Sequence, residues 1–463
     1  MHSRHSYILM TLVFLAFFSC NDFTEQNLSF NDLKNLETRQ TKGNIDLLLS
    51  RPQEINKGNF SLEKVAANIA INVKRPSVKK LLDSIKELST TIDGHCNSVR
   101  VFESLKEEQL KQMRQPIQIS WKKAILNYHR VAAMNFGPGL KENSTVIESL
   151  YSFLESEKDF TPGKCSLDLI KTRYSITEER GRNAANVLPS LSSVENYHLR
   201  GLDSIEALFF GPLNKSKCKI PNQRVIDYFK KPLIKRESHT CIISKHLMKD
   251  ILRKTQELEK SWDSNYGNYT EKMLRGQYGP IVEVINNISQ ALFYLDTNIK
   301  DKKLAYPAGL DVRINGENKK CINTNCYDYR EHPYSEIGFD AIEVSLIAFR
   351  DLFQGRSIIN QKKGFGLDNL LIENGLPGVA TRMLYGIETT LKNIRKLKNS
   401  TNLKDALEKI SSEKCEQSRS ENRLEEICSI IWDIRKTSDA LKNEYINALS
   451  GISAPRQAQG DND

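Results

Sequence analysis

The fold is decided by the stretch ISKHLMKDILRKTQELEKSW, residues 243–262, in which apolar side chains recur every three to four positions. This spacing places Ile243, Leu247, Ile251, Leu258 and Trp262 on one face of a helix. No convincing run of alternating apolar and polar residues, bounded by turn residues, predicts a strand. The sequence therefore predicts an all-α fold. The same helical period returns in residues 281–295, 384–394 and 424–434.

A short internal sequence repeat indicates how the helices are grouped. The stretch Gly201-Leu-Asp-Ser-Ile-Glu206 recurs 137 residues later as Gly338-Phe-Asp-Ala-Ile-Glu343, and a tryptophan precedes each copy at similar range. We therefore expect two antiparallel helical bundles that form a pseudo-duplicated pair. Breaks rich in proline and glycine separate the helices, as such bundles require, at residues 137–139, 211–212, 279–280 and 307–309.

The first twenty residues have the features of a lipoprotein export signal. A charged start is followed by an apolar run at residues 7–18, by Ser19 and then by Cys20. Twelve apolar residues are fewer than the ~20 that a transmembrane helix needs, and no later apolar run comes close. We expect a lipid anchor on Cys20 that holds the protein at a membrane of the bacterial cell envelope, on the outer membrane or the periplasmic face. An uncleaved signal and an ordinarily cleaved signal are the alternatives.

Length, composition and charge limit the class of protein, its partners and its division into segments. The 463 residues are 39% hydrophobic and 27% charged, which is ordinary for a globular protein of two or three domains. Scattered basic residues give a net charge of +10, which in an exported protein favours anionic lipid, polysaccharide or an acidic protein partner over nucleic acid. The expected segments are a signal peptide at 1–19, a flexible polar tether at 20–59, an N-terminal bundle at 60–219, a C-terminal bundle at 220–451 and a disordered tail at 452–463.

Two pairs of carboxylates are candidate metal ligands. Asp203 with Glu206, and Asp340 with Glu343, are spaced at i and i+3, so each pair shares one helix face with Cβ atoms about 5–6 Å apart. In a helical bundle such carboxylates can converge on one ion. The alternative is structural, because an acidic residue at a helix start followed by glutamate three positions later is also a capping box.

Three histidines are further candidates. His198 and His332 stand shortly before the two carboxylate pairs, and His129 lies on the predicted helix after Trp121. A lone histidine is equally compatible with a surface or structural role. The chain contains no His-Glu-x-x-His, no Gly-x-Ser-x-Gly and no phosphate-binding glycine loop, so hydrolase and nucleotide chemistry have no motif to support them.

With these segments in view, the chain resembles the imelysin family of exported, mostly helical proteins, which are also described as iron-regulated lipoproteins. The likeness spans about residues 62–450. Its markers follow the family order: Trp121, Asn135-Phe-Gly-Pro138, Cys165-Ser-Leu-Asp168, residues 200–211, Trp262, Glu331-His-Pro-Tyr-Ser335 and residues 364–371. The resemblance implies two helical bundles with a site in the cleft between them.

The resemblance also bears on activity. The family is named for a proposed metallopeptidase with a Gly-x-His-x-x-Glu motif, but here Asp203 stands in place of that histidine. An Asp and Glu pair suits iron, manganese or calcium better than a zinc peptidase centre, so the sequence favours binding over catalysis. We expect a lipoprotein that binds a divalent metal, iron foremost, or a metal-bearing ligand, in iron acquisition. A non-enzymatic surface scaffold for another protein or host molecule is the alternative.

The cysteine count predicts a disulfide framework. Eight cysteines remain after Cys20, an even number suited to an oxidising compartment. A zinc site at Cys321 and Cys326 is the sharper alternative, although no second cysteine or histidine pair completes it. Sequence proximity together with the family pattern gives the expected pairs Cys96–Cys165, Cys218–Cys241, Cys321–Cys326 and Cys415–Cys428.

Overall fold

The computed structural model describes residues 49, 55–56, 58–138, 144–151, 164–192, 199–218, 220–314, 317–319, 326–410, 413, 415 and 426–448. Helices dominate these residues, and the all-α prediction is confirmed. Two three-residue strands, β1 (Val312–Ile314) and β2 (Glu317–Lys319), form one antiparallel pair. In the part of the chain that is described, no helix is both long and apolar enough to cross a membrane. The predicted signal peptide, Cys20 and the predicted tail lie outside the described residues.

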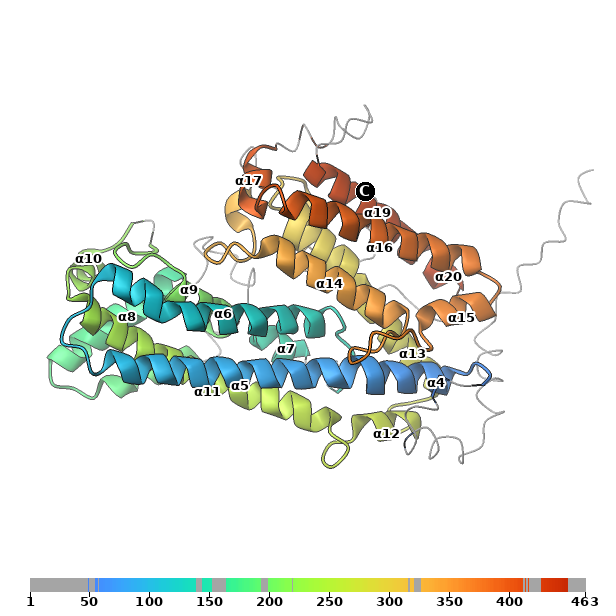
Figure 1. Ribbon diagram of the computed structural model, residues 1–463, viewed down its shortest axis with the longest axis horizontal. Coiled ribbons are helices and arrows are strands. Elements are labelled where there is room, and N and C mark those ends of the chain that lie inside the picture. Colours follow the sequence, from blue (N-terminus) through green and yellow to red (C-terminus); the bar gives the residue numbers. More distant parts are fainter. Residues whose placement is uncertain are drawn as a thin grey trace, which may run out of the picture.

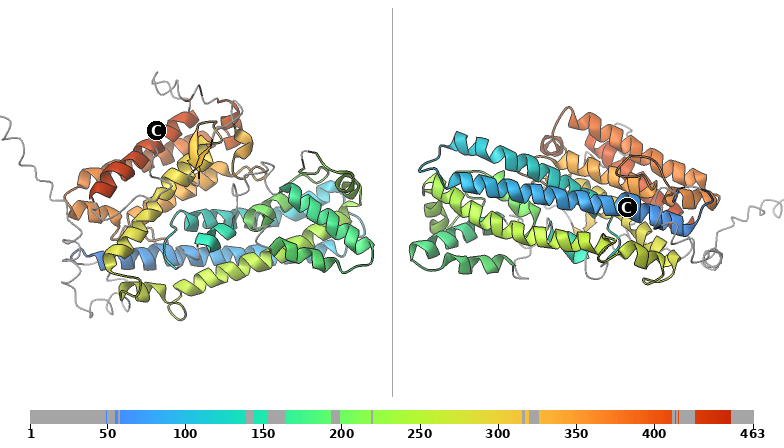
Figure 2. Two further views of the ribbon diagram at one scale, coloured as in Figure 1. Left: turned by 180° about the vertical axis from the view of Figure 1, so that it is seen from behind. Right: turned by 60° about the horizontal axis from the view of Figure 1, so that its bottom comes forward.

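The first bundle is built around one long continuous helix (Figures 1 and 2). This helix consists of α4 (Leu62–Asn68), the π-helical η2 (Ile69–Lys74) and α5 (Arg75–Val99), which follow one another without a break. The α5 helix lies between α6 (Glu107–Ala132) and α11 (Leu233–Trp262) and packs against both. Shorter elements complete the bundle: α7 (Ser144–Ser149), α8 (Lys164–Glu179), η3 (Ala184–Ser192), α9 (Leu202–Phe209), α10 (Gln223–Phe229) and α12 (Tyr269–Leu274).

The second bundle lies alongside the first (Figure 1). Its main members are η6 (Leu295–Ala305), α14 (Gly338–Phe353), α16 (Pro377–Lys398) and α19 (Glu426–Asp439), and α14 also packs against α6. A single hydrophobic core runs through both bundles. The remaining elements are α13 (Ile281–Gln290), η5 (Ala291–Phe293), η7 (Tyr327–Tyr329), α15 (Leu367–Glu373), α17 (Leu403–Glu408), η8 (Ala440–Tyr445) and α20 (Ile446–Ala448).

The helix face predicted for residues 243–262 is confirmed, and it explains where α11 lies. All five of its apolar residues are buried, and the ring of Trp262 packs against Gly137, where a Cβ atom would come within 2.3 Å of that ring. Gly137 also has φ = 105°, a backbone conformation that favours glycine. Because α11 packs against α5, we group it with the first bundle, and the domain boundary at residue 219 stays a prediction.

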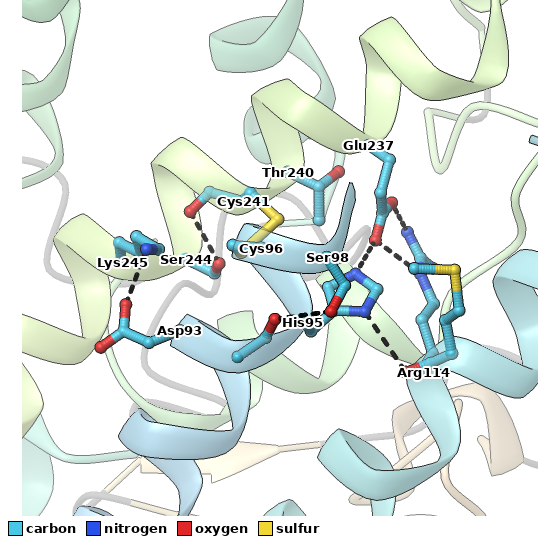
Figure 3. The surroundings of a disulfide bond; sticks show 12 residues. Asp93, His95, Cys96, Ser98, Arg114, Glu237, Thr240, Cys241, Ser244 and Lys245 are labelled. Atoms are coloured by element: carbon cyan, nitrogen blue, oxygen red, sulfur yellow. Dashed lines mark hydrogen bonds and ion pairs between the residues drawn. A yellow bond between two sulfur atoms is a disulfide. The ribbon is translucent and has the colours of Figure 1, made fainter. Parts of the chain in front are cut away.

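The disulfides correct two of the predicted pairs. Cys96 on α5 bonds to Cys241 on α11 with Cα atoms 5.5 Å apart, and Figure 3 shows this bond between the two helices. Cys165 bonds to Cys218, and Cys415 bonds to Cys428 as predicted. The predicted pairs Cys96–Cys165 and Cys218–Cys241 are therefore wrong, because helix packing brings together cysteines that are 145 residues apart in the chain. Cys326 is disulfide-bonded, and its predicted partner Cys321 lies outside the described residues.

Candidate metal-binding site

Two histidines meet where the bundles join. His129 lies on α6, and His332 lies in the loop that leads to α14 of the second bundle. Both side chains are fully buried, and their Nε2 atoms are 2.8 Å apart. His332 has φ = 58°, a left-handed conformation that is uncommon for residues other than glycine. Such a backbone persists only where surrounding contacts fix it.

Glu206 supplies those contacts from α9. Its Oε1 atom accepts hydrogen bonds from the backbone N–H of Tyr334 (3.1 Å), the backbone N–H of Ser335 (2.9 Å) and the Ser335 hydroxyl (3.0 Å). Its Oε2 atom lies 3.2 Å from Nδ1 of His332. One buried carboxylate of the first bundle therefore holds the loop of the second bundle and orients its histidine. This is a positioning role, which differs from both the ligand and the helix-cap interpretations of Glu206.

A lysine and a second glutamate complete the cluster. Lys303 on η6 forms a buried ion pair with Glu331, and its Nζ atom lies 3.4 Å from Nδ1 of His129. Burial lowers the pKa of His129 well below its usual value, and the charge of Lys303 lowers it further. His129 is therefore neutral at pH 7. Burial also lowers the pKa of Lys303, so its ammonium group gives up a proton more easily than an exposed lysine does.

The hydrogen bonds can be satisfied by one arrangement of protons. If the Glu206 carboxylate is ionised, His332 donates from Nδ1, and its Nε2 atom is left as an acceptor. His129 then donates from Nε2 and accepts from Lys303 at Nδ1. We assign these tautomers from the network. The two imidazoles in contact are thus held between the Lys303 ammonium group and the Glu206 carboxylate.

Aromatic rings enclose the cluster. The ring of Tyr151 lies 5.5 Å from the ring of His129 and 5.4 Å from that of His332, and the ring of Trp121 lies 5.6 Å from that of His332. Burial raises the pKa of Tyr151 well above its usual value, and the nearby carboxylates, that of Glu331 foremost, raise it further. The site is therefore a buried, low-dielectric environment, in which unpaired charge is costly.

Three side chains of this cluster could hold a metal ion. His129, Glu331 and His332 each offer one ligand atom, these atoms all lie within 4.8 Å of one another, and all three residues are buried. Two neutral imidazoles and one carboxylate are a donor set suited to iron(II) and related transition metals. The ammonium group of Lys303 pairs with the same carboxylate, so an ion would take its place there. The low pKa of Lys303 favours that exchange, and the residues fit a metal.

The structure separates the predicted site residues into two groups. Asp203, Glu206 and His332 are buried, and His332 belongs to the metal-compatible set. In contrast, Asp340 and Glu343 are paired on the α14 surface with cations of α16: Lys398 contacts both carboxylates, and Arg395 contacts Glu343 at 2.7 Å.

The sequence pointed only weakly to two residues of the cluster, Glu331 and His129. Glu331 was seen in the sequence only as a family marker, although its position beside His332 could have pointed to it. His129 was one of three candidate histidines, and no local spacing linked it to His332. His198 lies outside the described residues.

Fold and site together define a class: an all-α protein of two packed bundles, with a buried His-Glu-His cluster where the bundles meet. The imelysin family model matches residues 75–425, and the chain belongs to the imelysin family. A comparison with curated proteins gave no significant match.

Two solved structures are similar. One, from Parabacteroides distasonis ATCC 8503, is described as an iron-regulated protein A precursor; it is 14% identical, covers 82% of this chain and 95% of its own, and has a TM-score of 0.50. The other, an imelysin-like protein from Psychrobacter arcticum 273-4, is 13% identical, with coverages of 86% and 98% and a TM-score of 0.49. At such low identity, the likeness to the first structure shows the fold alone.

Proposed function

We propose that this imelysin-family protein binds a divalent transition-metal ion through His129, Glu331 and His332, and that it serves iron acquisition at the cell envelope. The observation that carries the proposal is the convergence of three buried ligand atoms within 4.8 Å. Iron is the favoured ion because two imidazoles and a carboxylate suit iron(II). The description of the Parabacteroides distasonis structure as iron-regulated gives further support.

The burial of the cluster favours binding over peptide hydrolysis. A peptidase must bring its metal, a water molecule and a peptide bond together at an accessible position. Here His129 and His332 are fully buried, and Glu331 is only 9% exposed. Glu206 contributes through the loop that it holds, so its removal should weaken metal binding indirectly.

Metal titration tests the proposal. Iron(II) under anaerobic conditions, manganese(II) and zinc(II) are titrated calorimetrically into the wild type and into His129→Ala and Glu331→Gln. We expect wild-type binding in the micromolar range or tighter, and at least about 100-fold weaker binding in both variants. The matched control is Glu343→Gln, which makes the same chemical change as Glu331→Gln on the α14 surface and should bind as the wild type does. Circular dichroism confirms that each variant is folded.

Two results would overturn this assignment. Wild-type protein that binds no metal below millimolar concentrations would leave the scaffold alternative as the better account. Metal binding that survives in both His129→Ala and Glu331→Gln would move the site elsewhere in the chain.

We also propose that the protein is exported and lipid-anchored through Cys20. The apolar run that ends at Ser19 and Cys20 supports this, as do the disulfides, because disulfides persist mainly in oxidising compartments. The description of the Parabacteroides distasonis structure as a precursor agrees with export. Cys20→Ala should move the protein from the detergent phase to the aqueous phase in a phase-partition assay and abolish acyl labelling. Unchanged partitioning would rule out this anchor.

A further inference from the structure

A second cluster of buried charges lies in the first bundle, and the metal proposal makes no use of it. Four basic side chains line one small cavity: Arg114 on α6, Lys171 on α8, Lys217 after α9 and Arg236 on α11. Each is largely buried, with exposed fractions of 5% for Arg114, 7% for Lys171 and 9% for Arg236, and 2% for the Lys217 side chain. Four basic side chains from different elements therefore line one small, partly open cavity.

The carboxylates near the cavity do not balance this charge. Glu237 pairs with Arg114, whose Nε atom donates to its Oε1 atom at 3.1 Å, and it also contacts His95, as Figure 3 shows. Asp168 alone serves both lysines, and both Nζ atoms lie 3.1 Å from its Oδ1 atom. Two carboxylates thus face four permanent or potential cations.

The hydrogen-bond partners of Arg236 are neutral, although the nearby charges of Glu237 and Glu107 oppose the lowering of its pKa by burial. Its guanidinium group donates to the backbone carbonyls of Lys231 and Leu213 and to the side-chain carbonyl of Asn214. Among the described residues, it forms no salt bridge with a carboxylate. If all of these groups are ionised, the four basic side chains exceed the carboxylates of Glu237 and Asp168 by two charges, and partial deprotonation of Lys217 reduces this excess. A charge buried without a partner costs several kcal/mol, so the arrangement calls for an anion.

Burial and a neighbouring cation both act on the pKa of Lys217. Burial lowers the pKa of Lys217 to about 7, and the neighbouring charge of Lys171 adds to the effect. Asp168 opposes this shift but does not cancel it. A bound anion would supply the missing negative charge and keep this ammonium group protonated.

The size of the cavity limits what it can hold. Its volume is about 20 Å³, which is room for roughly one water-sized occupant. A polyatomic anion such as phosphate is too large for it. A neighbouring pocket of about 460 Å³ shares Arg114, Pro212 and Leu213 with the cavity and is lined by exposed residues that include Lys215. This pocket provides a route from solvent.

We propose that the cavity lined by Arg114, Lys171, Lys217 and Arg236 is a binding site for a monatomic anion of the halide class, with chloride as the physiological ligand. The anion neutralises the four basic side chains and bridges α6, α8 and α11 through them. The site is separate from the metal cluster and does not depend on it.

Chloride titration in melting experiments tests the proposal. Chloride replaces gluconate at constant ionic strength, so that general screening stays fixed, and the melting temperature of the wild type is followed. We expect a saturable rise, because a ligand that binds only the folded state stabilises it. Lys217→Met should lower the apparent chloride affinity at least about tenfold. Lys215→Met makes the same change on the exposed rim of the outer pocket and should respond as the wild type does.

Direct detection covers the case in which Lys217→Met does not fold. Wild-type crystals soaked in bromide should give an anomalous peak in contact with Lys217 and Arg236. A cavity that contains only water would show no such peak, and this result overturns the proposal. Equal melting temperatures in chloride and gluconate, or an undiminished chloride response in folded Lys217→Met, overturn it as well.

Discussion

Breaking the Cys96–Cys241 disulfide should destabilise the protein more than breaking Cys415–Cys428. The comparison is well matched, because all four cysteines are at most 5% exposed and their replacement by alanine removes similar buried volume. What differs is the length of chain that each bond closes. The sequence separation is 145 residues for the first bond and 13 for the second.

The expected magnitude follows from loop entropy. The Cys165–Cys218 bond lies within the larger loop and shortens the path from Cys96 to Cys241 to roughly 90 residues. In the chain-entropy treatment, a loop of that length is worth about 4.6 kcal/mol at 25 °C, and a 13-residue loop about 2.9 kcal/mol. The double variant Cys96→Ala/Cys241→Ala should therefore lose about 1.7 kcal/mol more than Cys415→Ala/Cys428→Ala.

Urea unfolding under non-reducing conditions measures this difference. Because one hydrophobic core runs through both bundles, we expect a single main transition that circular dichroism can follow. Peptide mapping without reduction checks that the remaining disulfides are intact in each variant, and it should recover Cys96 and Cys241 in one linked fragment. A variant without Cys415–Cys428 that is equally or more destabilised would refute the entropic reasoning. A linked fragment of Cys96 and Cys165 would refute the pairing itself.

Three further predictions concern single residues. Glu206→Gln should cost about 1–3 kcal/mol in urea unfolding, because an amide NH2 group cannot accept one of the hydrogen bonds that the carboxylate accepts and a buried donor is left unsatisfied, whereas Glu343→Gln should cost less than about 1 kcal/mol; equal costs would contradict the positioning role. Gly137→Ala should lower the melting temperature clearly more than Gly375→Ala, since both have positive φ but only Gly137 faces the Trp262 ring, and similar losses would show that this contact is unimportant. Burial lowers the pKa of Lys74 to about 7, so above that pH the unfolded state binds more protons than the folded state does. The free energy of unfolding should therefore rise between pH 7 and 10 by up to about 1.4 kcal/mol per pH unit. Lys74→Met should flatten this dependence of the free energy of unfolding on pH, and an unchanged dependence would count against the buried charge.

The fold could be predicted from the sequence because helix formation leaves a local record. The apolar period of residues 243–262 is imposed by burial of one helix face, and each of its five apolar positions is buried as predicted. Disulfide pairing leaves no such record. Cys96 meets Cys241 because α5 and α11 pack side by side, and sequence proximity favoured nearer cysteines instead.

The candidate site could be predicted only in part, because local spacing in the sequence does not determine which elements pack together. Glu206 of the first motif contacts His332, whereas the repeat at Asp340 and Glu343 faces cations on α16, because identical local spacing does not fix which neighbour a helix face meets. His129 and His332 are 203 residues apart and come together only when the bundles dock. A cluster made by docking cannot be found from spacing along one helix.

The described disulfides all lie within one bundle or the other, so among the described residues the seam between the bundles is held by noncovalent contacts, with Glu206 and its loop at the centre. A metal ion at the His-Glu-His cluster would be enclosed by that seam. Its entry and release would then require the contacts between Glu206 and the His332 loop to open. The lifetime of the bound metal would thus depend on how the two bundles are packed as well as on the strength of its ligand bonds.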